Sequence, residues 1–344
     1  MANESLQSFV RHLQESDAYR GNTRVRSIID EGIQRISALP EDGSGAELRR
    51  EIRQMHTRIA PLLHTPSNNR ETGGISMAEA QNILGDNHFF GTEALQKAFP
   101  GTAIESTAIP LIPFSKAELE RAKELGHSLR LRIDHAPDGD ALTMKKMHEM
   151  LQPTFETDNN GKILYEVSWY GNEEFFTTET PNMCWVLTSD EVIPNSESKD
   201  YLQQTELIAE YLQDTVYDGV ELPQEYAEAI EELNEQKDEI RSLISAESWR
   251  EAADKLAALS INQLTRRTPS ETLHDLLVSF QDKDTRNLQN RWDWTNVQSS
   301  DGFLVGVGCF VSGGVDVGSD EPDVSSDGSL GVVLSRKFLR PSTS

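Results

Sequence analysis

The stretch from residue 301 to residue 330 constrains the fold more than any other part of this 344-residue chain. It contains seven glycines, six valines, five aspartates and five serines, and it has no lysine, arginine, asparagine, glutamine, threonine or alanine. Such a composition cannot sustain a helix of any length, because glycine and β-branched valine both lower helix propensity. Glycine, serine and aspartate are also typical of disorder. The interleaved apolar residues favour short strands and tight turns instead; they are Phe303, Val305, Val307, Phe310, Val315 and Val317.

The sequence around this stretch predicts further strands. Alternating apolar and polar residues are typical of a strand with one buried face, and aromatic or β-branched residues raise strand propensity. Strands are expected over residues 128–134, 163–169, 184–188, 291–295 and 330–334. The first of these, SLRLRID, has the alternation of a half-buried strand.

Helices are expected in much of the remaining chain. Residues 1–65 are expected to form an N-terminal α-helical region, because apolar residues recur there at helical spacing. A linker with short helices follows over 66–109, and from about 199 to 260 the pattern is helical and strongly acidic. Three helix starts have the sequence of a capping box, in which two side chains satisfy free backbone donors. They are Ser76 with Glu79, Ser115 with Glu118, and Thr268 with Glu271, and we interpret them as structural signals.

The charge of the chain narrows its possible partners. Lysine and arginine number 32 and aspartate and glutamate 57, which gives a formal net charge of −25. Binding to a phosphate backbone needs a surplus of basic residues, so no nucleic-acid partner is expected. No apolar run of about 18 residues exists, so no membrane partner is expected. Because residues 1–20 lack the apolar core of a secretion signal and two cysteines cannot form a disulfide framework, we expect a cytoplasmic protein.

The sequence contains no complete catalytic or metal-binding motif. The eight histidines are scattered, and no His-x-x-x-His or Cys-x-x-Cys pair is present, so a transition-metal site is not expected. Residues 156–161 imitate the start of a calcium loop, but its twelfth position is Val167 rather than glutamate. We therefore expect no metal, no cofactor and no catalytic residue.

The order of short motifs from Trp292 to Phe338 resembles a known family. It runs W-x-W, S-S-D-G-x-L-V, V-G-x-F, G-V-x-V, P-x-x-S, L-G-V, S-R-x-F, and it is similar to the C-terminal end of a C-type-lectin-like domain of the formylglycine-generating-enzyme type. More particularly, it resembles the variable proteins of bacterial diversity-generating retroelements. The segment RRTPSE at 266–271 resembles the family's R-x-P-T-x-x-E motif, with Thr and Pro in reversed order.

The resemblance implies an α+β fold. The C-type-lectin-like domain would cover residues 110–340, with the helical stretch at about 199–260 as an insertion and the helical region 1–65 preceding it. The first strand of such a fold pairs with the last. We therefore expect residues 129–134 and 330–336 to lie side by side, although about 200 residues separate them.

The resemblance also accounts for the unusual composition. In these retroelements, template adenines are copied to random bases, mainly in AAC or AAT codons, and the accessible residues include Gly, Ser, Asp, Val, Cys and Phe. Within 301–330 only Glu321 falls outside the accessible set. The resemblance thus implies a variable, ligand-binding segment at about 295–335. A plain turn-rich β segment that avoids long polar residues is the alternative interpretation.

The favoured function is a non-enzymatic binding protein whose partner is a protein or a small ligand. Trp292 and Trp294 would frame its surface, by packing or by contact. The enzyme branch of the superfamily uses a pair of cysteines near the C-terminal end, whereas this chain has only Cys309 there. An enzyme with a carboxylate site assembled from distant segments, and a structural or assembly protein, remain as alternatives. The expected ligand-facing residues are Cys309, Val311, Ser312, Val315, Asp316, Gly318, Ser319, Asp320, Glu321, Asp323, Ser325 and Ser326.

Overall fold

The chain divides into two units, Met1–Gly73 and Gly74–Ser344. The computed structural model describes residues 26, 29–30, 33–35, 74–102, 104, 109–324 and 328–337. In the first unit the described residues are helical, and Ile29 is buried. The rest of the helical region expected over 1–65 lies outside the described residues.

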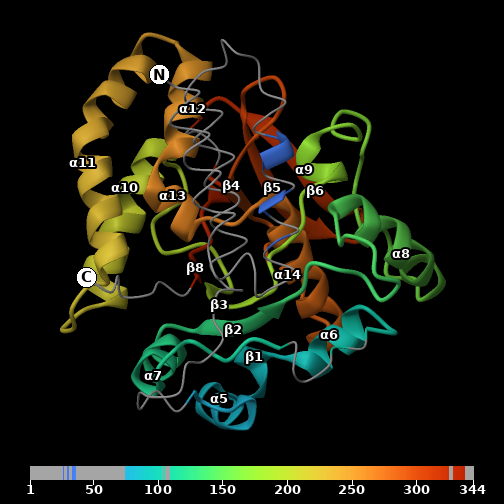
Figure 1. The fold of residues 1–344 in the computed structure, drawn as a ribbon. Coiled ribbons are helices and arrows are strands. Elements are labelled where there is room, and N and C mark those ends of the chain that lie inside the picture. Colours follow the sequence, from blue (N-terminus) through green and yellow to red (C-terminus); the bar gives the residue numbers. More distant parts are fainter. Residues whose placement is uncertain are drawn as a thin grey trace. The chain divides into compact units, whose positions relative to one another are not determined.

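The described part of the second unit is an α+β structure with two four-stranded sheets, which confirms the fold class at this level (Figure 1). The first sheet has the order β1-β2-β3-β8, and the second has the order β6-β5-β4-β7. The strands of the first sheet are β1 Phe89–Phe90, β2 His127–Arg132, β3 Cys184–Ser189 and β8 Ser335–Lys337. Those of the second are β4 Trp292–Gln298, β5 Leu304–Val311, β6 Gly314–Asp320 and β7 Leu330–Gly331.

The expected pairing of residues 129–134 with 330–336 is wrong in detail. Strand β3 lies between β2 and β8, so β2 and β8 share a sheet without being neighbours. Residues 330–331 form β7, which pairs with β4 in the other sheet. The chain crosses between the sheets over three buried residues, Val332 to Leu334, which the sequence pattern had merged into one strand. A hydrogen bond of 3.3 Å from Arg132 Nη2 to Ser335 Oγ links β2 to β8 directly.

The helices form two groups, on opposite sides of the second sheet in Figure 1. The group that packs on the first core consists of α5 Met77–Leu84, α6 Thr92–Ala98, α7 Lys116–Glu124, α8 Met144–Thr157, α9 Glu174–Thr177 and α14 Pro269–Lys283, with a 3-10 turn, η2, at Asp86–His88. The helices expected over about 199–260 are present as α10 Tyr201–Tyr211, the π-helical turn η3 Leu212–Val216, α11 Gln224–Ser245, α12 Trp249–Ala258 and α13 Ser260–Thr265.

Two of the expected capping boxes are complete. At α7, Ser115 accepts a hydrogen bond from the backbone of Glu118, and Glu118 accepts one from the backbone of Ser115. Thr268 and Glu271 exchange the same bonds at α14, which has proline at its first position. At α5, Ser76 accepts from the backbone N–H of Glu79. These local bonds fix where the helices begin, as their sequences predict.

Two apolar cores stabilise the second unit. One lies between the first sheet, the inner face of the second sheet and helices α6, α8 and α14. The other lies between the outer face of the second sheet and the helices of the insertion. Both faces of β4 and β5 are therefore covered over part of their length.

The strand expected over 163–169 is not formed. This segment makes only an isolated bridge, between Leu164 and Val315 of β6. Its alternating pattern reflects apolar side chains that pack on the core next to aromatic side chains that face outward.

Candidate binding surface and the charge network behind it

The two faces of the second sheet have different chemistry. Register places Asp293, Val307 and Val317 opposite one another on the inner face. On the outer face, Trp292, Gly308 and Asp316 form the corresponding row. Because successive side chains of a strand point to opposite faces, this register sorts the composition-biased segment into an apolar inner side and a polar outer side.

The helical insertion covers one end of the outer face. Trp294 is 0% exposed there and packs edge-to-face on Tyr201 of α10, with ring centroids 5.2 Å apart. Leu304 and Leu330 belong to the same core. Of the two framing tryptophans, Trp294 is therefore a core residue that acts by packing.

Trp292 lies further along the outer face, is half-buried and packs against the margin of the same core. A Cβ atom placed on Gly306 or Gly318 would lie 3.6 or 3.5 Å from its indole ring. The ring thus lies across β5 and β6 over positions that have no side chain. Asp316 lies in the same cross-strand row as Trp292, with Gly308 between them.

The structure places most of the expected ligand-facing residues at or near the surface. Val311, Ser312, Asp320 and Asp323 are exposed. The partly exposed members are Cys309, Asp316, Gly318, Ser319 and Glu321. Ser325 and Ser326 lie outside the described residues.

The assignment of Val315 to the surface is wrong. Its side chain is 0% exposed and packs in the inner core. Val315 and Val317 are two residues apart on one strand, so their side chains point to the same face of the sheet. Because Val317 is buried on the inner face, Val315 is buried there too.

Several glycines of the segment are fixed by close packing. A Cβ on Gly308 would lie 2.2 Å from the carbonyl oxygen of Arg291, and one on Gly314 would lie 2.5 Å from the carbonyl carbon of Leu164. Gly314 also has a φ of +112°, which disfavours other residues. Gly318 would meet only the Trp292 ring, at ordinary contact distance. Within the same segment, some glycines are therefore framework and others are open to change.

Three residues beside β6 were not predicted from the sequence to be part of this surface; they are Tyr165, Glu166 and Trp169. Tyr165 and Trp169 are 56% and 42% exposed, which is unusual for aromatic side chains of this size. The Tyr165 N–H donates to the Val315 carbonyl at 2.9 Å, and Trp169 Nε1 donates to the Val317 carbonyl at 3.0 Å. These bonds hold both residues, with Glu166 between them, along the free edge of β6. The sequence did contain one sign of this surface, because the strand expected over 163–169 has aromatic residues close to a glutamate.

We call the exposed residues of this region the hairpin surface. Asp316 is its most perturbed group: burial raises its pKa, the Val317 N–H opposes this by donating to its carboxylate, and the charge of Glu166 adds to the rise. The hairpin surface consists of Trp292, Asp316, Gly318, Ser319 and Asp320 on the sheet, with Tyr165, Glu166 and Trp169 along its edge.

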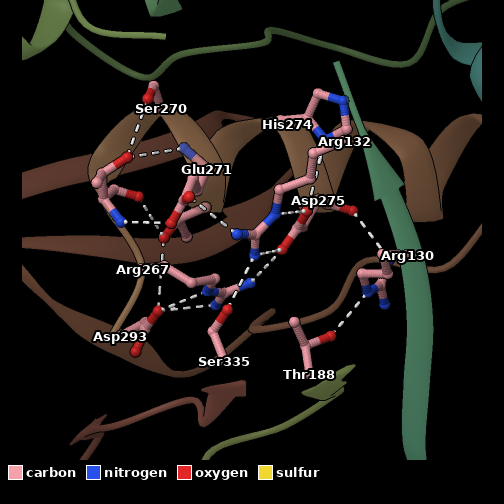
Figure 2. Close-up of polar contacts among 12 residues, drawn as sticks. Arg130, Arg132, Thr188, Arg267, Ser270, Glu271, His274, Asp275, Asp293 and Ser335 are labelled. Carbon is pink, nitrogen blue, oxygen red and sulfur yellow. Dashed lines mark hydrogen bonds and ion pairs between the residues drawn. The ribbon is translucent and has the colours of Figure 1, made fainter. Parts of the chain in front are cut away.

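Figure 2 shows a network of charged side chains buried behind the inner face. Arg132 of β2 lies 3.1 Å from a Glu271 oxygen and 2.7 Å from an Asp275 oxygen, both on α14. Arg267 bridges from Asp275, at 3.4 Å, to Asp293 of β4, at 2.8 Å. Each of these side chains is at most 5% exposed.

The network joins both sheets to one helix. Asp293 also accepts a hydrogen bond of 2.7 Å from the backbone N–H of Val333, in the crossover between β7 and β8. Burial opposes ionisation of Asp275, but the Arg132 charge and the hydrogen bonds from Arg132 and His274 prevail and hold its pKa well below the ordinary value. Charged groups with this degree of mutual pairing hold a backbone in one arrangement, because each would be costly alone.

The network also corrects the expectation for β2, which is buried on both faces. Arg130 and Arg132 point toward α14 rather than toward water. The carboxylates of Glu271, Asp275 and Asp293 come from distant segments, as an assembled catalytic site would require. Each is paired with arginine and closed to solvent, and this arrangement is typical of a scaffold.

A second cluster contains serine, histidine and aspartate but lacks the geometry of a catalytic triad. The Ser128 hydroxyl donates to Asp190 Oδ2 at 2.8 Å, and His88 Nδ1 contacts the same oxygen at 3.1 Å. In a triad the histidine stands between the other two and uses one ring nitrogen for each. Here Asp190 also pairs with Arg130 at 2.7 Å. The cluster is an ion-pair site at the end of β2.

Metal and thiol chemistry have few candidates in the described part of the chain. Within it, no three His, Cys, Asp or Glu side chains are grouped so that they could hold a metal ion. Cys184 and Cys309 lie in different sheets and form no disulfide with each other. Burial raises the pKa of Cys184 to about 11, which makes it a poor nucleophile. No described helix is long and apolar enough to cross a membrane.

Comparison of the chain with models of known families, with curated proteins and with solved structures found no match.

Proposed function

We propose that this is a non-enzymatic ligand-binding protein that presents a diversified surface on a C-type-lectin-like scaffold. One observation carries the proposal: the hairpin of β5 and β6 separates framework from surface within a single biased segment. Val305, Val307, Phe310 and Val317 are buried in the inner core, while Gly306, Gly308, Asp316 and Gly318 alternate with them on the outer face. Such a segment tolerates change at its surface while its backbone stays fixed.

The packing behind the hairpin supports this role. The arginine and carboxylate network joins β2, β4 and α14, and it lies on the inner face only. Among the described residues, the outer-face positions Trp292, Gly308 and Asp316 take no part in this network. Replacing side chains of this face should leave the scaffold intact, as a diversified binding protein requires.

The architecture supports the proposed family. Helix α14 begins at the segment that resembles the family motif, with Thr268 and Glu271 forming its capping box. The helical insertion leaves the core after β3 and returns before α14. We propose that residues 110–340 form the C-type-lectin-like domain and that its variable part lies at about 295–335. Two cysteines that form no disulfide agree with the proposed cytoplasmic location, where thiols stay reduced.

The DNA next to the gene tests the proposal. We expect a reverse transcriptase gene and a near-copy of the codons for residues 295–335 that differs from them at adenines. Sequences from related strains should then differ at codons for outer-face residues and agree at Gly308, Gly314 and Phe310. If the repeat is absent and the outer face does not vary between strains, diversification is refuted.

A further inference from the structure

Two carboxylates of the hairpin surface, those of Glu166 and Asp316, lie beside the bridge that joins Leu164 to Val315 and act on each other electrostatically. Glu166 is of the same sign as Asp316, and its charge helps to raise the pKa of Asp316. Among the described residues, no lysine or arginine acts on Asp316 in the opposite direction. Glu166 accepts a hydrogen bond of 2.7 Å from the Ser168 hydroxyl, which is a neutral partner. The free chain therefore leaves negative charge concentrated at this edge of β6.

The nearest arginine to the hairpin tip has other contacts. Arg286 donates to the carbonyls of Val311, at 3.1 Å, and Asn160, at 2.7 Å. Its guanidinium also lies 4.3 Å from the centre of the Phe280 ring. Arg286 is thus held beside the hairpin tip by these contacts and does not neutralise Asp316.

Exposed aromatic rings stand next to these carboxylates. Tyr165 and Glu166 are adjacent in the chain, and the indole of Trp169 is anchored to the backbone next to Asp316. The faces of tyrosine and tryptophan rings attract cations, and the attraction adds to that of a carboxylate. A lysine or arginine side chain is the common protein group that satisfies both.

A buried hydroxyl group points to the same place. Tyr170 is 0% exposed, and its hydroxyl has no hydrogen-bond partner in the described structure. It lies near enough to Asp316 and Glu166 for both charges to act on it. Buried polar groups are nearly always paired, so an unpaired one beside two unneutralised carboxylates indicates a site whose polar contacts are incomplete in the free chain.

We propose that this end of the hairpin surface binds a cationic side chain, an arginine guanidinium or a lysine ammonium, in an exposed segment of a partner protein. The inference rests on the proposed binding function and adds the chemistry of the ligand. Carboxylates recognise a guanidinium through paired, charge-assisted hydrogen bonds. The net charge of −25 favours the approach of a basic partner from a distance.

The test compares two double variants of the full chain that change the net charge equally. Asp316→Asn with Glu166→Gln removes the proposed site, and Glu231→Gln with Glu235→Gln removes two exposed carboxylates of α11. The probe is a fluorescent peptide of alternating arginine and glycine, and its binding is measured by anisotropy at about 0.15 M ionic strength to screen general attraction. The site variant should bind at least about tenfold more weakly than the parent, and the α11 variant within about twofold.

Two results would overturn the inference. One is an equal loss in both double variants, because the attraction would then come from overall charge. The other is a parent protein that does not bind the arginine peptide. Tyr165→Ser, at an exposed position, should weaken binding several-fold if the ring contributes; an unchanged affinity would remove the aromatic half of the proposed site.

Selection of binders from a random peptide library separates failure of this inference from failure of the proposed function. If the selected peptides lack lysine and arginine but lose binding to a Gly318→Trp variant, the surface binds ligands and only the cationic class is wrong. If no selected peptide depends on the hairpin surface, both proposals fail. Enrichment of basic residues that is lost in the site variant supports both.

Discussion

Truncating Phe310 should damage the fold far more than placing a large residue on the outer face of the same hairpin. Phe310 is 0% exposed, packs edge-to-face on Phe280 with centroids 5.6 Å apart, and lies under the Arg286 guanidinium at 4.5 Å. Replacing such a phenylalanine by alanine costs about 3–5 kcal/mol, and the lost ring contacts place this case toward the upper end.

The corresponding changes at the surface should be nearly silent. Asp316→Tyr and Ser319→Tyr add a ring at partly exposed positions, where substitutions usually change stability by about 0.5 kcal/mol or less. At about 2–4 °C for each kcal/mol in a domain of this size, Phe310→Ala should lower the thermal midpoint by roughly 10 °C. The tyrosine variants should melt within about 2 °C of the parent.

The assay is thermal unfolding followed by circular dichroism, with the three variants and the parent in one buffer. If the tyrosine variants unfold and the Phe310 variant does not, surface and core have been exchanged. The assignment of the binding surface would then be wrong as well. A loss of similar size in all variants would show that the outer face takes part in the packing, contrary to its exposure.

Three further predictions concern the scaffold. Gly308→Ala should lower the thermal midpoint by several degrees, because its Cβ would lie 2.2 Å from a backbone oxygen, whereas Gly318→Ala should leave it nearly unchanged. Arg132→Met removes the buried arginine that Glu271 and Asp275 share and leaves Lys337, at 3.1 Å, and Arg267, at 3.4 Å, to pair with them, so it should cost about 3 kcal/mol in chemical unfolding; Arg241→Met, which breaks two surface pairs of α11, should cost about 1 kcal/mol or less. Burial lowers the pKa of His127 to about 3, so its contribution to stability is complete above pH 6.5 and is lost as the pH falls toward 3. Between pH 6 and 4.5, the free energy of unfolding of the parent should therefore fall more steeply than that of His127→Gln, by up to about 1.4 kcal/mol per pH unit. Urea unfolding at several pH values measures both slopes, and equal slopes would contradict the prediction.

The local signals in the sequence predict much of the fold. The capping boxes at Ser115 and Thr268 begin helices, and the strand patterns at 128–134, 184–188 and 291–295 mark β2, β3 and the start of β4. These features depend on side chains and backbone groups within a few residues of one another. Such contacts are the kind that a linear pattern contains.

The arrangement of the strands could not be obtained in this way. The alternation in SLRLRID is the same whether its polar face meets water or a helix that carries carboxylates, and here Arg132 meets Glu271 and Asp275. Those two acidic residues are four apart on α14 and so share one face, a spacing that was visible in the sequence. Their partner on β2 was not visible, because about 140 residues separate Arg132 from Asp275 along the chain.

The candidate surface could be predicted in part for the same reason. Alternation within β5 and β6 is local, so Val317 and Asp316 were assigned to the correct faces, and strict use of the rule would have placed Val315 inward. Tyr165, Glu166 and Trp169 join the surface only through contacts with the edge of β6, about 150 residues further along. A free edge strand offers unpaired backbone groups, and some nearby segment must cover them. The sequence does not say which segment does so, and in this protein the covering segment brings the acidic and aromatic groups that give the surface its chemistry.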